Sequence, residues 1–501
     1  MTQPTDPPAT AGRAAVSGRR FGSTNWLLFA VGFAVFLGAL DQTVVVTLLK
    51  PIMDGVGVPL DQFYRAAWIV NGYILGYVVA MPLMGRVADV YGHGRIFLVA
   101  LGIFIAGSLW VSACHDLNML VAARAVQALG GGAMVPVAMA IVAENVQPSR
   151  RALALGFLGA AAEGGGLLGP LWGGSLVQLI GWRGHFWINA PLCLPVIYIV
   201  LRAYRDKERS RASVDYLGGL LLAGALTALA IALTDDPVAA RSVEVNVALY
   251  LLAAAFAAAF IWREYVAKTP MLMLSLFRSR PFAAGNLTHL LMGGGLIVAM
   301  VSIPVFSIAI QNQSYFRGGL NLMRLTVMLP VGAILGGYLA GWLGYHRTTA
   351  LGMAVSALGF FFMRFWGADI GDPQYTLNLM LTGLGFGLII APVSAAVINS
   401  VAEEQRATAS AILTVMRLVG MLIGVALLTS KGLGQFYQQA GNVALDDPRY
   451  EELVKGLEVS TFSDIFTVTA IVCLVAAIPA LLIGRGVVRR FKWTEIWRGP
   501  H

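Results

Sequence analysis

Residues 165–174 form the most specific stretch of this chain: Gly165-Gly-Leu-Leu-Gly169-Pro170-Leu-Trp-Gly173-Gly174. In a helix, glycines four residues apart lie on one face and carry no side chain there, so another helix can approach closely. Pro170 removes one backbone hydrogen bond and bends the helix. The stretch lies inside an apolar segment, 151–180, that is long enough to cross a bilayer. It therefore predicts closely packed helices inside a membrane.

Apolar segments of spanning length recur along the whole chain. Of its 501 residues, 57% are hydrophobic and 12% are charged, whereas about 25% of the residues of a soluble domain are charged. The segments, about fourteen in number, lie near 25–49, 67–85, 95–113, 117–143, 151–180, 186–203, 216–234, 245–262, 284–310, 324–343, 348–367, 376–400, 407–430 and 463–484. The first apolar run is long enough to span a bilayer, unlike the core of a signal peptide. We expect an all-α membrane protein.

The net charge of +9 could indicate nucleic-acid binding or membrane topology, and the positions of the charges favour topology. Basic residues gather in alternate connections between the apolar segments, such as 202–211 and 485–498, and are fewer in the others. Membrane proteins keep an excess of Lys and Arg on the cytoplasmic side. We therefore expect a multi-pass protein of the bacterial inner membrane with both termini in the cytoplasm, and no nucleic-acid partner.

Two charged connections, 202–215 and 263–281, divide the chain. Two six-helix bundles that rock about a site near the midplane are a common arrangement for alternating access. The expected units are a cytoplasmic tail at 1–24, a six-helix bundle at 25–205, a linker with two extra transmembrane helices at 206–283, a second six-helix bundle at 284–484 and a cytoplasmic tail at 485–501. The outer connection at 431–462 is rich in charge, which fits a solvated loop or a surface for a partner.

The connection after the second apolar segment carries a glycine-rich motif, Gly85-Arg-Val-Ala-Asp89-Val-Tyr-Gly92-His-Gly-Arg95. It resembles the major facilitator signature, Gly-x-x-x-Asp-Arg-x-Gly-Arg-Arg. The glycines permit a tight turn, and Asp89 can accept hydrogen bonds from helix amino termini or a basic neighbour. Val90, His93 and Gly94 replace basic residues of the signature, so we expect a thinner charge network. A weaker copy at 337–347 occupies the corresponding place in the second bundle and indicates a duplicated architecture.

Other motifs narrow the resemblance. The stretch at 165–174 is similar, at every motif position, to the antiporter motif of drug exporters. Further resemblances to fourteen-span exporters lie in Leu40-Asp41-Gln-Thr, Arg124-Ala-Val-Gln127, Trp182-Arg-Gly-His-Phe186-Trp-Ile-Asn189 and Arg417-Leu-Val-Gly420. Together they resemble the drug:proton antiporter-2 family. Asp41, Glu163 and Arg417 make the chain most similar to its lipid-exporting branch, whose members move triacylglycerides or related lipids.

An ionisable residue inside an apolar segment costs at least about 2.5–3.5 kcal/mol, and four such residues are the best candidates for a functional role. Asp41 and Arg124 lie at compatible depths and are expected to pair within the first bundle. Glu163 and Arg417 lie nearer the middle of their segments and are expected to form an ion pair between the bundles. We assign proton coupling to Asp41, Glu163 and Arg124. Static ion pairs that serve assembly are the alternative.

The motifs thus imply a proton-coupled exporter of lipophilic compounds, best fitted to lipids of the triacylglyceride type. A multidrug:proton antiporter is the nearest alternative, and a membrane enzyme is disfavoured because no nucleophile–base set or metal-ligand cluster is evident. We expect no cofactor and no metal, with energy taken from the proton motive force. Expected partners are the lipophilic substrate, protons, membrane lipids and, by resemblance, an extracytoplasmic lipid-binding lipoprotein. A monomer is expected.

Overall fold

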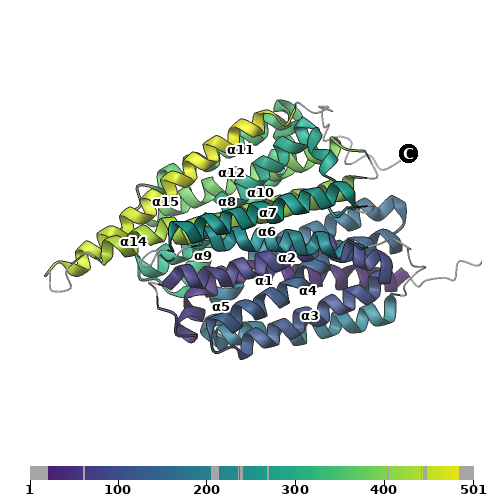
Figure 1. Cartoon of the computed structure of the whole chain (residues 1–501), viewed down its shortest axis with the longest axis horizontal. Helices are drawn as coiled ribbons and strands as arrows, with labels where there is room; N and C mark the ends of the chain where they lie inside the picture. The colour runs from purple at the N-terminus through teal and green to yellow at the C-terminus, as the bar shows by residue number, and fades with distance from the viewer. Residues whose placement is uncertain are drawn as a thin grey trace, which may run out of the picture.

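The computed structural model describes residues 21–59, 62–204, 214–234, 236, 241–267, 270–402, 405–441, 443 and 448–484. Within these ranges the chain is helical and holds no strand, which confirms the predicted fold class. In Figure 1 the early helices lie together on one side and the late helices on the other. We call α1–α5 the first bundle and α8–α15 the second bundle, because the helices of each set pack mainly on one another.

The bounds of the helices follow the apolar segments. The first bundle holds α1 (Phe21–Gly55), α2 (Phe63–Tyr91), α3 (His93–Ala113), α4 (Leu117–Asn145) and α5 (Pro148–Ala203). The second bundle holds α8 (Arg280–Ala309), α9 (Tyr315–Thr326), α10 (Met328–Leu343), α11 (Tyr345–Met363), α12 (Asp372–Asn399), α13 (Arg406–Leu427), α14 (Leu433–Ala440) and α15 (Tyr450–Leu481). Between the bundles come α6 (Tyr216–Leu233), α7 (Val243–Val266) and a short 3₁₀ helix, η2 (Leu274–Arg278).

Helix α5 crosses the membrane twice. It has 56 residues, whereas about 20 are enough to span a bilayer. At Gly181 the backbone adopts φ 70° and ψ 173°, which favours glycine, and the chain turns back there. By length and composition, twelve helices of the described chain could cross a membrane, with α5 counted once and α11 left out. Counting both halves of α5 and adding the 19-residue α11 gives about the fourteen crossings predicted.

Glycines with positive φ also end two other helices. Gly92 (φ 102°) separates α2 from α3, and Gly344 (φ 81°) separates α10 from α11. Each lies seven residues after the first glycine of its motif, the signature at 85–95 and the weaker copy at 337–347. The two bundles therefore make the same sharp turn at corresponding points of the repeated motif.

Helix α6 packs on α2 of the first bundle and on α13 of the second, while α7 packs on α6 (Figure 1). At one end of α6, Ser430 Oγ donates a hydrogen bond to the carbonyl oxygen of Leu233, at 2.7 Å. At the other end, Asp215 accepts from the backbone N–H of Gly218 and forms an ion pair with Arg263 of α7, at 3.0 Å. The pair of extra helices thus lies across one of the seams between the bundles.

The connection predicted at 431–462 is largely helical, so its interpretation as a loop is wrong. A π-helical turn, η4 (Leu428–Gly432), leads into α14, and α15 already begins at Tyr450. Glu451 and Glu452 lie in the first turn of α15, where acidic side chains stabilise the positive end of the helix dipole. In Figure 1, α14 and the start of α15 project beyond the ends of the other helices.

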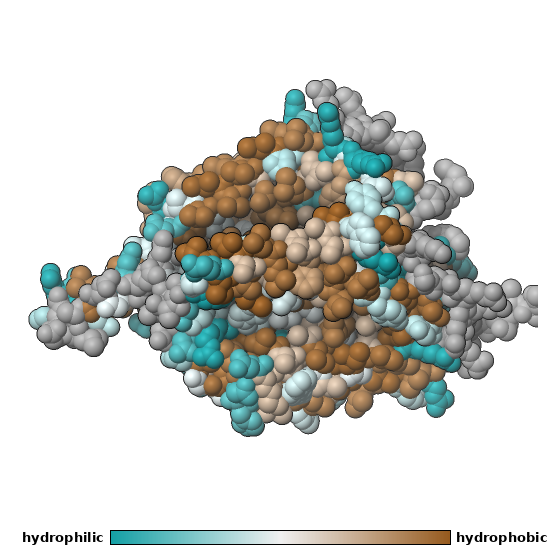
Figure 2. Space-filling view, in the orientation of Figure 1, coloured by the Kyte–Doolittle hydropathy of each residue, from teal (hydrophilic) through white to brown (hydrophobic). Residues whose placement is uncertain are grey.

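The surface has the polarity that a bilayer requires. On the face shown in Figure 2, apolar side chains form a broad band across the middle of the helices, and hydrophilic side chains gather toward the two ends. Helix α7 contributes strongly to such a surface, because only 11% of the residues in its most apolar 18-residue stretch are buried. Apolar residues that face outward over this depth are stable in lipid and not in water.

Candidate functional site

Two fully buried charges meet inside the first bundle. Arg124 Nη1 on α4 donates to Asp41 Oδ2 on α1 at 2.5 Å, and neither side chain is exposed. Arg124 Nη2 donates in addition to the backbone carbonyl of Asp41, at 3.3 Å. The structure thus places the two residues of the predicted pair in direct contact. Since an isolated charge at membrane depth is costly, each residue supplies the counter-charge that the other needs.

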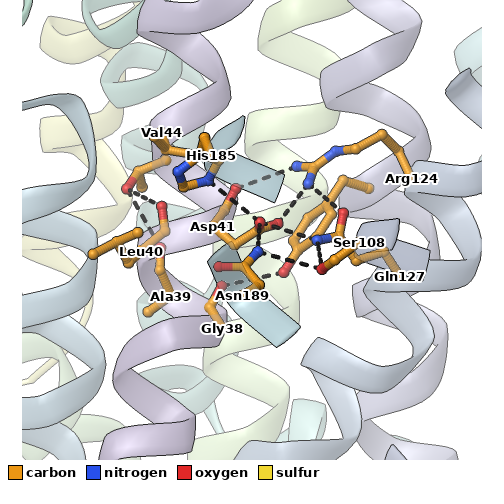
Figure 3. A network of polar contacts seen from close by, with 12 residues as sticks. Gly38, Ala39, Leu40, Asp41, Val44, Ser108, Arg124, Gln127, His185 and Asn189 are labelled. Atoms are coloured by element: carbon orange, nitrogen blue, oxygen red, sulfur yellow. Dashed lines mark hydrogen bonds and ion pairs between the residues drawn. The ribbon is translucent and has the colours of Figure 1, made fainter. Parts of the chain in front are cut away.

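Uncharged polar side chains complete the hydrogen bonding of this pair (Figure 3). Asp41 Oδ1 accepts from Gln127 Nε2 at 3.0 Å and from Asn189 Nδ2 at 2.9 Å. Gln127 Oε1 accepts from Arg124 Nη1 at 2.6 Å. Ser108 Oγ lies 2.7 Å from Gln127 Nε2 and 3.3 Å from Asn189 Nδ2. His185 Nε2 lies 3.6 Å from Asp41 Oδ1.

These residues form what we call the Asp41 site, made of Asp41, Ser108, Arg124, Gln127, His185 and Asn189, all buried. Four helices contribute, namely α1, α3, α4 and the second half of α5. The turn at Gly181 returns that half to the bundle, and Arg183 holds it there by donating to the carbonyl of Cys114, at the end of α3, at 3.0 Å. The continuation of α5 past Gly181 is therefore what delivers His185 and Asn189 to Asp41.

Aromatic rings cover the guanidinium of Arg124. Its Cζ lies 4.0 Å from the centroid of Tyr73 and 5.4 Å from that of Phe186, distances at which a cation is attracted to the face of a ring. The hydroxyl of Tyr73 donates to the carbonyl oxygen of Gly38 at 3.1 Å. In this conformation the Asp41 site is closed to solvent on every side.

Glu163, which the sequence groups with Asp41 for proton coupling, lies apart from the Asp41 site. It lies on α5 and pairs with Arg417 on α13, with 3.5 Å between Glu163 Oε1 and Arg417 Nη1. The pair bridges the two bundles, as predicted from the positions of the residues. Its surroundings differ from the expectation, because the Glu163 side chain is 51% exposed and that of Arg417 21% exposed. The ion pair therefore faces an open space and is not enclosed by protein.

A double-mutant cycle on this pair is expected to give a small coupling energy. Exposed ion pairs contribute about 0.2–1 kcal/mol, well below a buried pair. Glu163→Gln and Arg417→Gln, alone and together, should therefore show a coupling of about that size in the free energy of unfolding. Thermal or denaturant unfolding of the purified variants measures it.

A control cycle combines Glu163→Gln with Arg324→Gln, because Arg324 pairs with Asp372 within the second bundle. That combination should be additive within about 0.5 kcal/mol. A cysteine cross-link beside Glu163 and Arg417 should also form in one orientation of the bundles and not in the other. Two results together would contradict a functional ion pair: strict additivity in the first cycle, and cross-linking whose yield does not change with a proton gradient. Glu163 and Arg417 would then be separate structural charges.

The glycines at 165–174 face two different neighbours. Gly165, Gly169 and Gly173 lie against α1, and a Cβ on Gly173 would come within 2.5 Å of Thr47 Oγ1. Gly174 faces α9 of the second bundle, where a Cβ would lie 2.9 Å from the carbonyl oxygen of Tyr315. A Cβ on Gly319 of α9 would likewise lie 2.6 Å from the carbonyl oxygen of Pro170. One short motif therefore packs the first bundle and also closes its contact with the second.

A family model described as Major Facilitator Superfamily matches residues 31–425, most of both bundles. The chain belongs to this superfamily. It is a multi-pass membrane transporter and not an enzyme.

Relatives of known name agree with this assignment. A triacylglyceride transporter of Mycolicibacterium smegmatis is 34% identical over 493 residues, covering 92% of this chain and 88% of the relative. A triacylglyceride transporter of Mycobacterium tuberculosis is 35% identical over 485 residues, covering 91% and 93%.

Solved structures share the fold at low sequence identity. A bacterial homologue of the human lysosomal transporter Spinster, in an inward-facing and occupied conformation, has a TM-score of 0.67 at 14% identity, covering 93% of this chain and 97% of that one. The nucleoside transporter NupG has a TM-score of 0.62 at 12% identity, covering 91% and 99%. At this identity the likeness concerns the fold of a Major Facilitator Superfamily transporter alone.

The superfamily signature at 85–95 has an unusual centre in this transporter. His93 Nε2 lies 3.1 Å from Asp89 Oδ1, and His93 Nδ1 lies 2.9 Å from Glu144 Oε1 on α4. Glu144 Oε2 also accepts a hydrogen bond from the hydroxyl of Tyr204, at 2.5 Å. The sequence predicted a thinner charge network at this signature. In the structure the network joins α2, α3, α4 and the end of α5, and His93 stands where the signature has a basic residue.

Sequence reasoning missed four members of the Asp41 site: Ser108, Gln127, His185 and Asn189. Gln127, His185 and Asn189 lie inside the motifs at 124–127 and 182–189, which by themselves assign them no role. Two spacings could have found three of them: Gln127 follows Arg124 by three residues, and Asn189 follows His185 by four, so each pair shares a helix face. No comparable signal marks Ser108, a small polar residue in an apolar segment.

Proposed function

We propose that this transporter is a proton-coupled exporter of triacylglyceride-type lipids in the bacterial inner membrane, with both termini in the cytoplasm. The observation that carries proton coupling is the Asp41 site, a carboxylate and a guanidinium fully buried at membrane depth. Ionisable residues inside a membrane are costly and rare, and they mark proton and substrate pathways. The site would bind a proton in one orientation of the bundles and release it in the other.

The nature of the substrate is supported by the relatives and by the surface of the protein. Relatives that match almost the full chain are named triacylglyceride transporters. A hollow of about 400 Å³ among α8, α13 and α15 is lined mainly by apolar side chains and glycines, with Asp464 as its charged member. Such a lining can accommodate an acyl chain and has few groups to orient a polar solute. The partners that fit this function are the lipid, protons, membrane lipids and an extracytoplasmic lipid-binding lipoprotein. The proposed transporter works as a monomer.

A second candidate function is export of amphiphilic drugs in exchange for protons. The glycine motif at 165–174 favours it, because the motif resembles that of drug exporters and closes the contact between α5 and α9. The two functions share the coupling site and differ in what the bundles enclose. They are distinguished by the molecule that moves.

Reconstituted vesicles test the proposal. The purified protein is placed in liposomes that carry a fluorescent triacylglyceride and an internal pH-sensitive dye, and a pH gradient is imposed across the membrane. We expect the lipid to leave the donor leaflet faster with the gradient than without it, and protons to move in the opposite direction. Empty liposomes and protein without a gradient are the controls.

Three outcomes separate the candidates. Lipid movement that depends on the gradient supports the proposal. Gradient-driven movement of an amphiphilic dye without lipid movement assigns the second candidate instead. Lipid movement that is indifferent to the gradient and carries no protons would overturn proton coupling while leaving a lipid transporter.

A further inference from the structure

Within the described residues, Arg124 of the Asp41 site lacks a hydrogen-bond partner at Nε alone. The least bonded member of the site is His185. It is fully buried on the second half of α5, one helical turn before Asn189. Both of its ring nitrogens lack a hydrogen-bond partner within the described part of the chain. Buried polar groups are nearly always paired, so an unpaired buried imidazole calls for a functional explanation. Its Nε2 points toward Asp41 Oδ1, 3.6 Å away (Figure 3).

Asp41, by contrast, is already fully engaged. Oδ2 accepts from Arg124, while Oδ1 accepts from Gln127 and Asn189. A proton on Asp41 would remove the charge that balances the guanidinium of Arg124 and leave that cation buried without a counter-ion. Breaking a buried ion pair in this way is strongly destabilising.

A proton on His185 also leaves the site with one net positive charge, but it keeps the Asp41 carboxylate ionised beside both cations. Neutral imidazole carries one N–H, and imidazolium carries two. An N–H at Nε2 would face Asp41 Oδ1, and a small movement of the ring would turn the 3.6 Å contact into a hydrogen bond to a carboxylate. The pair of Asp41 and Arg124 stays intact, with Asp41 stabilising both cations.

The other groups around the imidazole do not compete for this role. Asp41 of α1 and Arg124 of α4 are the charged groups of the site. Tyr73 of α2 uses its hydroxyl to donate to Gly38, and Ser108 of α3 is uncharged. Cys193 lies two turns beyond His185 on the same helix and is buried as a free thiol. Histidine is the residue whose ordinary titration falls between about pH 5 and pH 8.

We propose that His185 is the group that takes up the transported proton, with Asp41 as its fixed counter-charge. The proton passes from water on one side of the membrane to Nε2 of His185, is held against Asp41 while the bundles change orientation, and leaves Nε2 for water on the other side. The inference rests on the proposed function, since it names the proton-binding atom of that antiport.

The test uses His185→Gln in the vesicle assay, with proton movement and lipid movement recorded separately. We expect proton movement to fall by at least about tenfold, while lipid movement down its own gradient continues within about twofold of the wild type. The rate of that downhill movement should also lose its dependence on pH between about 5.5 and about 8. A residue that only held the fold in place would lower both movements together and leave the pH profile unchanged.

His289→Gln is the matched control. His289 is also a buried histidine, on α8 of the second bundle, with Nδ1 bound to the carbonyl of Leu413 at 3.1 Å and Nε2 without a partner in the described residues. It should retain proton-coupled export. If His289→Gln loses coupling as fully as His185→Gln, or if His185→Gln keeps wild-type proton movement, the inference is overturned and antiport stands. If the wild type moves lipid without protons, the proposed function itself fails.

A second measurement holds even where His185→Gln does not fold. In protein labelled with ¹⁵N-histidine, the signal that disappears in His289→Gln belongs to His289, and His185 is the other buried histidine of the described chain. Lowering the pH from about 8 to about 5.5 should convert the His185 ring from a neutral imidazole to an imidazolium that donates a hydrogen bond. A ring that stays neutral over this range, while the protein moves protons in vesicles, would contradict the proposal.

Discussion

Asp41→Asn is expected to abolish proton-driven export and to lower the free energy of unfolding by about 3–5 kcal/mol. The substitution nearly keeps the shape of the side chain and removes its charge. Arg124, which is fully buried beside it, then has no counter-ion, and His185 has no carboxylate to face. Export by reconstituted protein and thermal unfolding of the same preparation measure the two effects.

Two controls separate charge balance from transport. Asp41→Asn combined with Arg124→Gln removes both charges, so stability should largely return while proton coupling stays absent. Asp372→Asn breaks the pair with Arg324, in which the Asp372 side chain is 72% exposed, and should cost less than about 1 kcal/mol. If Asp41→Asn exports normally against a gradient, coupling belongs to another residue, and Glu163 becomes the first to examine.

Gly174→Val is expected to shift the protein away from the present conformation, in which α5 lies against α9. A Cβ at Gly174 would approach the backbone of Tyr315 and Phe316, at 2.9 and 3.2 Å, and backbone cannot move aside as a flexible side chain can. The clash exists only while the two bundles touch at this point. Distances between spin labels placed at the two ends of the bundles measure the change in population.

Gly173→Val provides a matched comparison, because the neighbouring residue faces Val44 and Thr47 of α1 within the same bundle. It should lower thermal stability and leave the ratio of the two orientations nearly unchanged. The prediction is that adjacent substitutions of identical chemistry produce different effects, one on conformation and one on folding. Equal spin-label distances in Gly174→Val and the wild type would show that this contact does not govern the orientation of the bundles.

The sequence predicted the membrane-spanning segments well, because an apolar run of about 20 residues identifies a span whatever its surroundings. It also brought together the right charges, since depth along a helix follows from residue number. It could not supply the rest of the Asp41 site. Depth does not say which way a side chain points, and helices apolar on every side offer no periodic signal to show it. Ser108 therefore became recognisable only once α3 and α5 were packed.

The region at 431–462 shows a different limit. Its charges predict an aqueous location, but a polar sequence can be helical as easily as irregular. Acidic residues at the start of α15 favour a helix there, and this local signal lies outside the apolar pattern used to locate spans. The bounds of a membrane helix in its aqueous part thus depend on capping and helix propensity, which hydropathy does not measure.

The turn at Gly181 has a mechanical consequence. It joins the two halves of α5 without an intervening loop. No flexible residues therefore separate the segment that touches α9 from the segment that carries His185. Because a single-residue turn joins the two halves, a movement of Gly174 away from Tyr315, seven residues before the turn, is passed to the imidazole four residues after it. Inserting two or three flexible residues beside Gly181 would let each half of α5 move alone. The bundles could then change orientation without moving His185, and proton binding would no longer follow the change.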